Sequence, residues 1–121
     1  MEPTIIVITA HGKETEFNEP ANINFLQEHL LVTVQTASST MGIHWDRLAG
    51  MIHTHEPSPE TSSQIICNAL LRFDNGQEKT IKIPQFQKCD LTLAQNTIKI
   101  IGTNTTAILN LDFFQWYRIH K

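Results

Sequence analysis

The sequence contains little glycine and proline, five of each among 121 residues, and this excludes a collagen-like or low-complexity chain. Nowhere do as many as about 18 apolar residues follow one another, so no transmembrane helix is predicted. The N-terminus lacks the basic region and the long apolar segment of a secretory signal peptide. We therefore expect a cytoplasmic protein in which Cys67 and Cys89 are reduced.

Positive charge is also scarce, and the formal net charge is −3. This argues against a protein whose main task is to coat a phosphate backbone. The balance is uneven: residues 1–60 contain 2 basic and 8 acidic residues, or −6, and residues 61–121 contain 7 basic and 4 acidic residues, or +3. Two faces of opposite sign would suit head-to-tail self-association, although scatter over a solvated surface explains the same numbers.

The sequence is rich in β-branched residues that alternate with polar ones, which is typical of strands. The clearest hairpin joins residues 65–73 to residues 79–83. A three-residue loop, Asp74–Gly76, would place Cys67 and Ala69 opposite Ile83 and Ile81, whereas a two-residue turn at Asn75-Gly76 would leave the apolar faces unmatched. We therefore predict the three-residue loop, with Gly76 at positive φ.

The same matching of apolar faces predicts further hairpins along the chain. They place Ile6 and Ile8 opposite Phe17 and Thr15 across His11-Gly12; Val32 and Val34 opposite Ile43 and Met41 across residues 37–40; Leu91 and Leu93 opposite Ile100 and Ile98; and Ile100 and Ile98 opposite Leu109 and Leu111. Residues 56–61 are predicted to form a surface loop between two halves of the chain.

These hairpins predict an all-β protein that forms one domain over residues 1–121. Nine or so short strands must close or pair their edges, so we expect a small antiparallel β-barrel or a two-sheet sandwich. At most one or two short helices are compatible with the sequence. One would contain Trp45, Leu48, Ala49 and Ile52, which recur at helical spacing. The other would span residues 113–120, with Asp112 as its N-cap residue and Gln115 at position N3.

Three histidines form the one group that could bind a metal. On a strand, His53 and His55 point to the same face, as two imidazole ligands must, and His44 lies nearby in the sequence. This indicates an alternative function, a metal-dependent hydrolase that uses His44, His53 and His55. The other interpretation is two surface histidines at the end of a strand.

The segment Gly50–Pro57 resembles the His-x-His-Pro part of the JAMM metalloproteases, and the resemblance implies metal-dependent hydrolysis. It covers about a dozen residues. Pro57 lies one position later than in that family, and Ser62 and Ser63 are not followed by an Asp ligand at the family's spacing. The sequence therefore offers no third ligand of the JAMM type.

Other chemical motifs are missing. The five glycines form no phosphate-binding loop and no nucleophile elbow, and an apolar run surrounds Cys67, which should raise the pKa of its thiol. No cofactor is predicted. A single-strand nucleic-acid-binding barrel is a third candidate, because lysines and aromatic residues cluster late in the chain, but the overall acidity opposes strong binding.

The C-terminal segment carries the leading functional hypothesis. If it continues as a strand, Phe114, Trp116, Arg118 and His120 leave the core face, and exposed aromatics beside Arg are typical of protein interfaces. If the chain instead bends at Gln115, Trp116 is buried. The sequence thus favours a non-enzymatic protein-interaction module that binds a protein partner, including a second copy of itself, through sheet edges and this aromatic segment. Its size would fit a small regulatory, inhibitory or assembly protein of a bacterium or phage.

Overall fold

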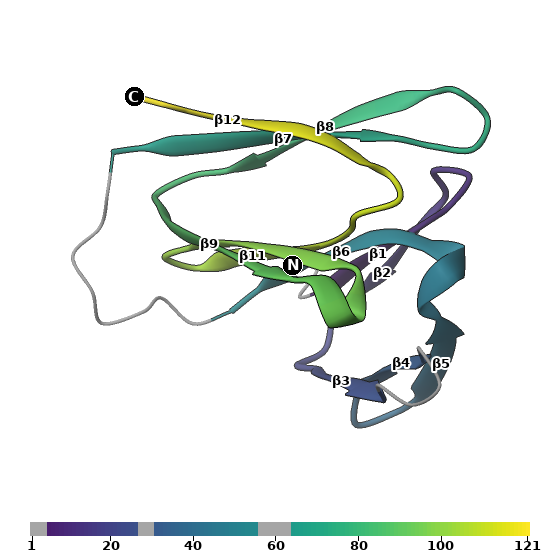
Figure 1. Ribbon diagram of the computed structural model, residues 1–121. Helices are drawn as coiled ribbons and strands as arrows, with labels where there is room; N and C mark the ends of the chain where they lie inside the picture. Colours follow the sequence, from purple (N-terminus) through teal and green to yellow (C-terminus); the bar gives the residue numbers. More distant parts are fainter. Residues whose placement is uncertain (1–4, 27–30, 56–63) are drawn as a thin grey trace.

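A computed structural model describes residues 5–26, 31–55 and 64–121 as an all-β protein with three antiparallel sheets (Figure 1). The largest has six strands in the order β2-β1-β6-β11-β10-β9, and we call it the central sheet. In that order its strands are Glu14–Phe17, Ile5–Thr9, Leu48–Thr54, Thr105–Asn110, Thr97–Gly102 and Phe86–Thr92. The all-β prediction is confirmed.

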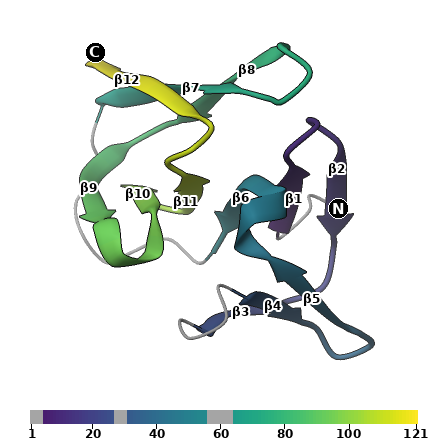
Figure 2. The same cartoon turned by 45° about the vertical axis from the view of Figure 1, so that its right-hand side comes forward.

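Two three-stranded sheets lie on opposite sides of the central sheet, as Figures 1 and 2 both show. The upper sheet has the order β12-β7-β8, with strands Phe114–His120, Ile66–Arg72 and Glu78–Ile83. The lower sheet has the order β3-β4-β5, with strands Asn22–Leu26, Leu31–Gln35 and Thr40–His44.

The described residues contain only two short 3-10 turns besides the strands, η2 (Trp45–Arg47) and η3 (Leu93–Gln95). Of the two segments compatible with helices, the first begins in η2 and continues as strand β6, and the second is strand β12. Within the described chain the sheets do not close into a barrel. That part of the chain also has no helix of the length and apolarity needed to cross a membrane. The predicted loop at 56–61 lies outside the described residues.

The central sheet is buried on both faces. Its strand β1 contributes Ile8 to the core beneath the upper sheet, and Ile5 and Val7 to the core above the lower sheet. Trp45, in η2, is fully buried in the lower core. Because both faces of β1 are covered, its sequence reads as a continuous apolar run and not as an alternation.

Two predicted hairpins are confirmed. Cys67 pairs with Ile83 and Ala69 with Ile81, across a loop in which Gly76 has φ of 86°. The second hairpin pairs Val32 with Ile43 and Val34 with Met41. In both, only one face is buried to a large extent, so alternation identifies the register.

The predicted register of the first hairpin is wrong by one residue. Ile5, and not Ile6, lies opposite Phe17, and Val7 lies opposite Thr15. The loop has three residues, Ala10–Gly12, with Gly12 at a φ of 88°. It has the geometry predicted for the loop Asp74–Gly76. Alternation could not exclude the two-residue turn because β1 is apolar on both faces.

The C-terminal meander has the predicted faces but a different register. Ile98 pairs with Leu91 and with Leu109, so each pairing is shifted by two residues from the prediction. Leu93 leaves the strand and lies in η3. A shift of two residues keeps every side chain on its face, so the apolar pattern cannot detect it.

Candidate functional site

Strand β12 is an edge strand of the upper sheet, and it contains all four predicted partner-binding residues. It runs antiparallel to β7, with Trp116 opposite Leu70 and Arg118 opposite Asn68. These partners alternate with the fully buried Ala69. Trp116, Arg118 and His120 therefore point away from the core, as predicted, and Trp116 is 46% exposed. The interpretation in which Trp116 is buried is wrong.

Phe114 does not lie on this outer face, so that part of the prediction is wrong. It pairs with the buried Leu71, and the register shifts between Phe114 and Trp116. This β-bulge at Gln115 inserts one residue and brings Phe114 to the inner face. There Phe114 packs against the upper core and stacks on Tyr117, with 6.2 Å between ring centroids.

His120 is tied to the neighbouring strand. The side-chain amide of Asn68 donates to Nε2 of His120 at 2.8 Å, and Nδ1 of His120 lies 3.3 Å from the carbonyl oxygen of Lys121. The end of β12 is thus held in place against β7.

Two edge strands, β12 and β9, carry apolar side chains that lie on the same face as the upper core but are left exposed. On β12, Tyr117 and Ile119 lie on the inner face opposite buried residues, yet they are 47% and 45% exposed. On β9, Leu91 lies opposite the buried Ile98 and is 59% exposed, and the nearby Leu93 is 75% exposed. We call Leu91, Leu93, Tyr117 and Ile119, with their strands, the open edge.

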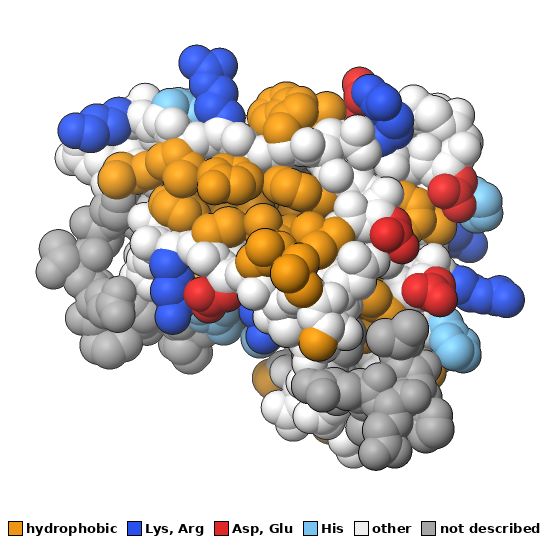
Figure 3. Space-filling model, viewed as in Figure 1, with side chains coloured by type: hydrophobic (Ala, Val, Ile, Leu, Met, Phe, Trp, Pro, Cys, Tyr) orange, Lys and Arg blue, Asp and Glu red, His pale blue; other side chains and the backbone are white. Residues whose placement is uncertain are grey.

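Figure 3 shows the consequence on the surface. A continuous band of apolar side chains runs across the molecule between β12 and β7 above and β9 below. Contiguous apolar surface of this kind is uncommon on monomeric proteins and marks sites of association. The sequence did not reveal it, because the exposure depends on β9 and β12 being edge strands of two different sheets.

The opposite side of the upper core is closed. Nζ of Lys79 on β8 lies 2.8 Å from Oε1 of Glu14 on β2. The main-chain amide of Asp74 donates to the carbonyl oxygen of Ala10 at 2.9 Å, and the side-chain amide of Asn75 donates to that of His11 at 3.2 Å. The two hairpin loops are therefore bonded to each other, in contrast to the open edge.

The structure brings two of the three predicted metal ligands together. The rings of His53 and His55 are 5.5 Å apart, and Nε2 of His55 lies 2.9 Å from the hydroxyl of Thr106. His44 is on the lower sheet, and over the described ranges no three His, Cys, Asp or Glu side chains form a metal-binding group. The metal site stays a prediction.

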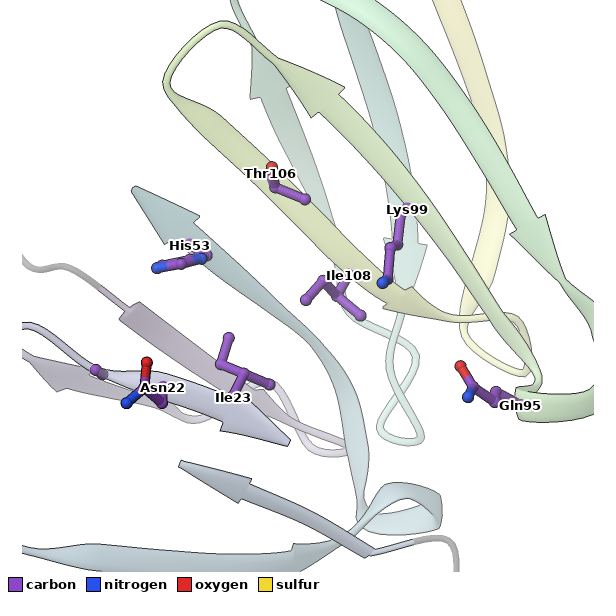
Figure 4. A pocket seen from close by; sticks show the side chains of 8 residues that line it. Asn22, Ile23, His53, Gln95, Lys99, Thr106 and Ile108 are labelled. Atoms are coloured by element: carbon purple, nitrogen blue, oxygen red, sulfur yellow. The ribbon is translucent and has the colours of Figure 1, made fainter. Parts of the chain in front are cut away.

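His53 lines an open cleft of about 480 Å³ between the central and lower sheets (Figure 4). Asn22 and Ile23 of β3 form one wall, and Lys99 of β10 lies across from them. Burial lowers the pKa of His53, and the nearby His55 lowers it further. No pattern in the sequence indicates this cleft, because β3 and β10 come to line one space only in the tertiary structure.

Only part of the predicted nucleic-acid-binding set shares one face, since Trp116, Arg118 and Lys82 lie on the outer face of the upper sheet. Trp116 and Tyr117 point to opposite sides of β12. Lys79 pairs with Glu14, and Lys88 lies 3.8 Å from Asp90. Stacking on adjacent bases requires aromatic rings that share a cationic surface. Nucleic-acid binding stays a prediction.

Both cysteines are free. Burial raises the pKa of the Cys67 thiol to about 11, with a smaller contribution from Cys89, as the apolar surroundings predict. Burial also raises the pKa of Cys89, and Asp90 adds to this shift. Neither thiol has the lowered pKa of a nucleophile.

No protein-family model matches the sequence, and no curated protein or solved structure matches it either.

Proposed function

We propose that this protein is a non-enzymatic interaction module that binds a protein partner along the open edge. The observation that carries the proposal is the exposure of Leu91, Leu93, Tyr117 and Ile119, at 45–75%, on two edge strands and the turn η3 that follows one of them. Edge strands present unpaired main-chain groups, and a partner strand can satisfy them. A role in regulation, inhibition or assembly fits such a module.

The energetics support binding at this site. Burying the exposed part of each large apolar side chain would contribute about 1–2 kcal/mol. Trp116 and Arg118 stand beside these residues on the outer face of β12, and Trp and Arg are among the residues that contribute most to protein interfaces. A partner that covers both faces of β12 would therefore gain from each of them.

Site-specific photo-crosslinking in the native host cells tests the proposal. A benzophenone amino acid is placed at Ile119 or at Leu93 on the open edge, and at Gln77 in the exposed β7–β8 loop as the matched control. We expect an adduct of one defined mass from both open-edge positions and none from Gln77. Adducts at all three positions alike, or at none, would contradict the proposal.

A further inference from the structure

We infer that the partner at the open edge is a second copy of this chain, which docks head to tail by placing its strand β2 alongside β12. This inference rests on the proposed function, since it names the partner of the same site. The argument depends on charge, on strand register and on the positions of the two strands.

The docking strand β2 (Glu14–Phe17) is the far edge of the central sheet. Glu14, Thr15 and Glu16 are exposed, and the strand contains no basic residue. Glu14 reaches Lys79 of its own chain, whereas Glu16 has no ion-pair partner in the part of the chain that the structure describes. The carboxylate of Glu16 is thus available to a neighbouring molecule.

The receiving strand β12 has the opposite charge. It carries Arg118 on its outer face, Lys121 follows directly, and the strand contains no acidic residue. Arg118 forms no ion pair with any residue in the described ranges. The two edges are therefore complementary in charge, which steers association and fixes which strands pair.

One antiparallel register brings unlike charges and aromatic rings together, with a single like-charged pair, Lys13 and Lys121, just beyond the strand ends. Placing Glu16 opposite Arg118 places Phe17 opposite Tyr117 and Glu14 opposite His120. Thr15 then lies opposite Ile119. Glu16 thus meets Arg118 on the outer face of β12, while Phe17, which packs against the lower core of its own chain, lies beside the apolar inner face at the open edge. Cross-strand pairs of this kind stabilise a sheet.

A symmetric pairing of two β12 strands fits less well. It would gather two copies of Arg118 and of Lys121 at one seam, with no acidic residue on either strand. In Figure 2, β2 lies at the right-hand side of the molecule and the C-terminal end of β12 at the upper left. A contact between β2 and β12 therefore joins two different molecules. The resulting pair still has one free β2 edge and one free β12 edge, so the contact can repeat into a ring or a filament.

Charge reversal on the full-length chain tests the inference. The variants are Glu16→Lys and Arg118→Glu, and the measurement is sedimentation over a range of concentrations and salt. We expect the unmodified protein to exceed the mass of one chain as concentration rises, and salt to weaken the association. Each single variant should associate at least about tenfold more weakly, since like charges then face each other.

An equimolar mixture of the two single variants should recover the association, because every contact between unlike copies again joins opposite charges. The double variant should recover it as well. Asp46→Lys and Arg47→Glu, which change exposed charges in η2 and outside the two strands, serve as matched controls and should associate as the unmodified protein does.

Three results would overturn the inference. One is a single-chain mass at every concentration, another is association that Glu16→Lys leaves unchanged, and the third is a mixture that does not recover. If the crosslink at Ile119 captures a different protein while the chain stays at single-chain mass, the inference fails and the proposed function stands. If that crosslink captures nothing, both fail.

Discussion

The side-chain amide of Asn110 donates a hydrogen bond to the main-chain carbonyl of Trp45 at 3.0 Å, although the two residues are 65 positions apart. The same amide donates to the carbonyl of Leu48 at 2.9 Å. Its oxygen accepts from the amide of Asp112 at 2.9 Å and from the side chain of Asn96 at 3.0 Å. Asn110 is fully buried, and these four bonds satisfy its amide group completely. They hold the turn at which the chain passes from the lower sheet to the central sheet.

Asn110→Ala should lower the free energy of unfolding by about 3 kcal/mol, because it removes four hydrogen bonds at a fully buried site. Urea unfolding measures the change. Asn24→Ala, at an exposed position of β3, is the matched control and should cost under ~0.5 kcal/mol. Equal losses in the two variants would show that the bonds of Asn110 contribute nothing.

Gly76→Val should destabilise the protein by about 1 kcal/mol or more, because φ of 86° strains any residue with a β-carbon. No atom lies within 4 Å of the position that a Cβ would take, so the cost is conformational and not steric. Gly42→Val, in an exposed strand without positive φ, should cost less. A neutral result at Gly76, measured by urea unfolding, would mean that the loop has another geometry.

The two tryptophans should respond in opposite ways. Trp116→Ala should barely change the melting temperature, yet weaken association about thirtyfold, since an interface aromatic contributes ~2 kcal/mol or more to binding. Trp45→Ala should cost roughly 3–5 kcal/mol of folding, because Trp45 is fully buried. Calorimetry and sedimentation on both variants measure this. A large loss of stability in Trp116→Ala would place Trp116 in a core.

Replacing His53 and His55 together by Gln should leave the melting temperature at neutral pH unchanged within error, because both are partly exposed and such substitutions usually cost under ~0.5 kcal/mol. Metal analysis of untagged protein provides the second measurement. Loss of bound zinc or of a hydrolytic activity in the double variant would contradict the interaction module and favour the metal-dependent hydrolase.

His53→Gln should make the protein less sensitive to acid. Burial, followed by His55, lowers the pKa of His53 in the folded state, so the unfolded chain binds the proton more tightly. Stability is therefore lost as the pH falls below about 6.5, the pKa of an unfolded histidine. His53→Gln removes this loss, and its unfolding free energy should fall less than that of the unmodified protein between neutral and mildly acidic pH. An identical decline in both would contradict the role of His53. Lys99 lines the same cleft and is present in both proteins, so its charge does not account for the difference between them.

Alternation predicted the hairpins wherever one face of a strand is buried and the other is not. It identified the pairing of Cys67 with Ile83 and of Val32 with Ile43. It failed for β1, where Ile5 and Ile8 are buried on opposite faces. It also failed to detect the shift of two residues at Ile98, because such a shift preserves each face.

Strand alternation also predicted one part of the candidate site. The outward direction of Trp116 and Arg118 follows from strand alternation, but the bulge at Gln115 moved Phe114 to the inner face. A bulge depends on how one strand is accommodated by its neighbour and leaves no mark in the apolar pattern. The exposure of Leu91 could not be predicted, since it depends on β9 being an edge strand.

The sequence by itself determined the all-β class, the three-residue loop that ends at Gly76 and the outward direction of Trp116, because glycine conformation and alternation are local properties. Only the tertiary structure decided that a central sheet is covered on both faces, that His53 shares a cleft with Lys99, and that the upper core stays open between β9 and β12. These features depend on which distant strands cover one another, and burial between distant strands is a property of the whole chain and not of any segment.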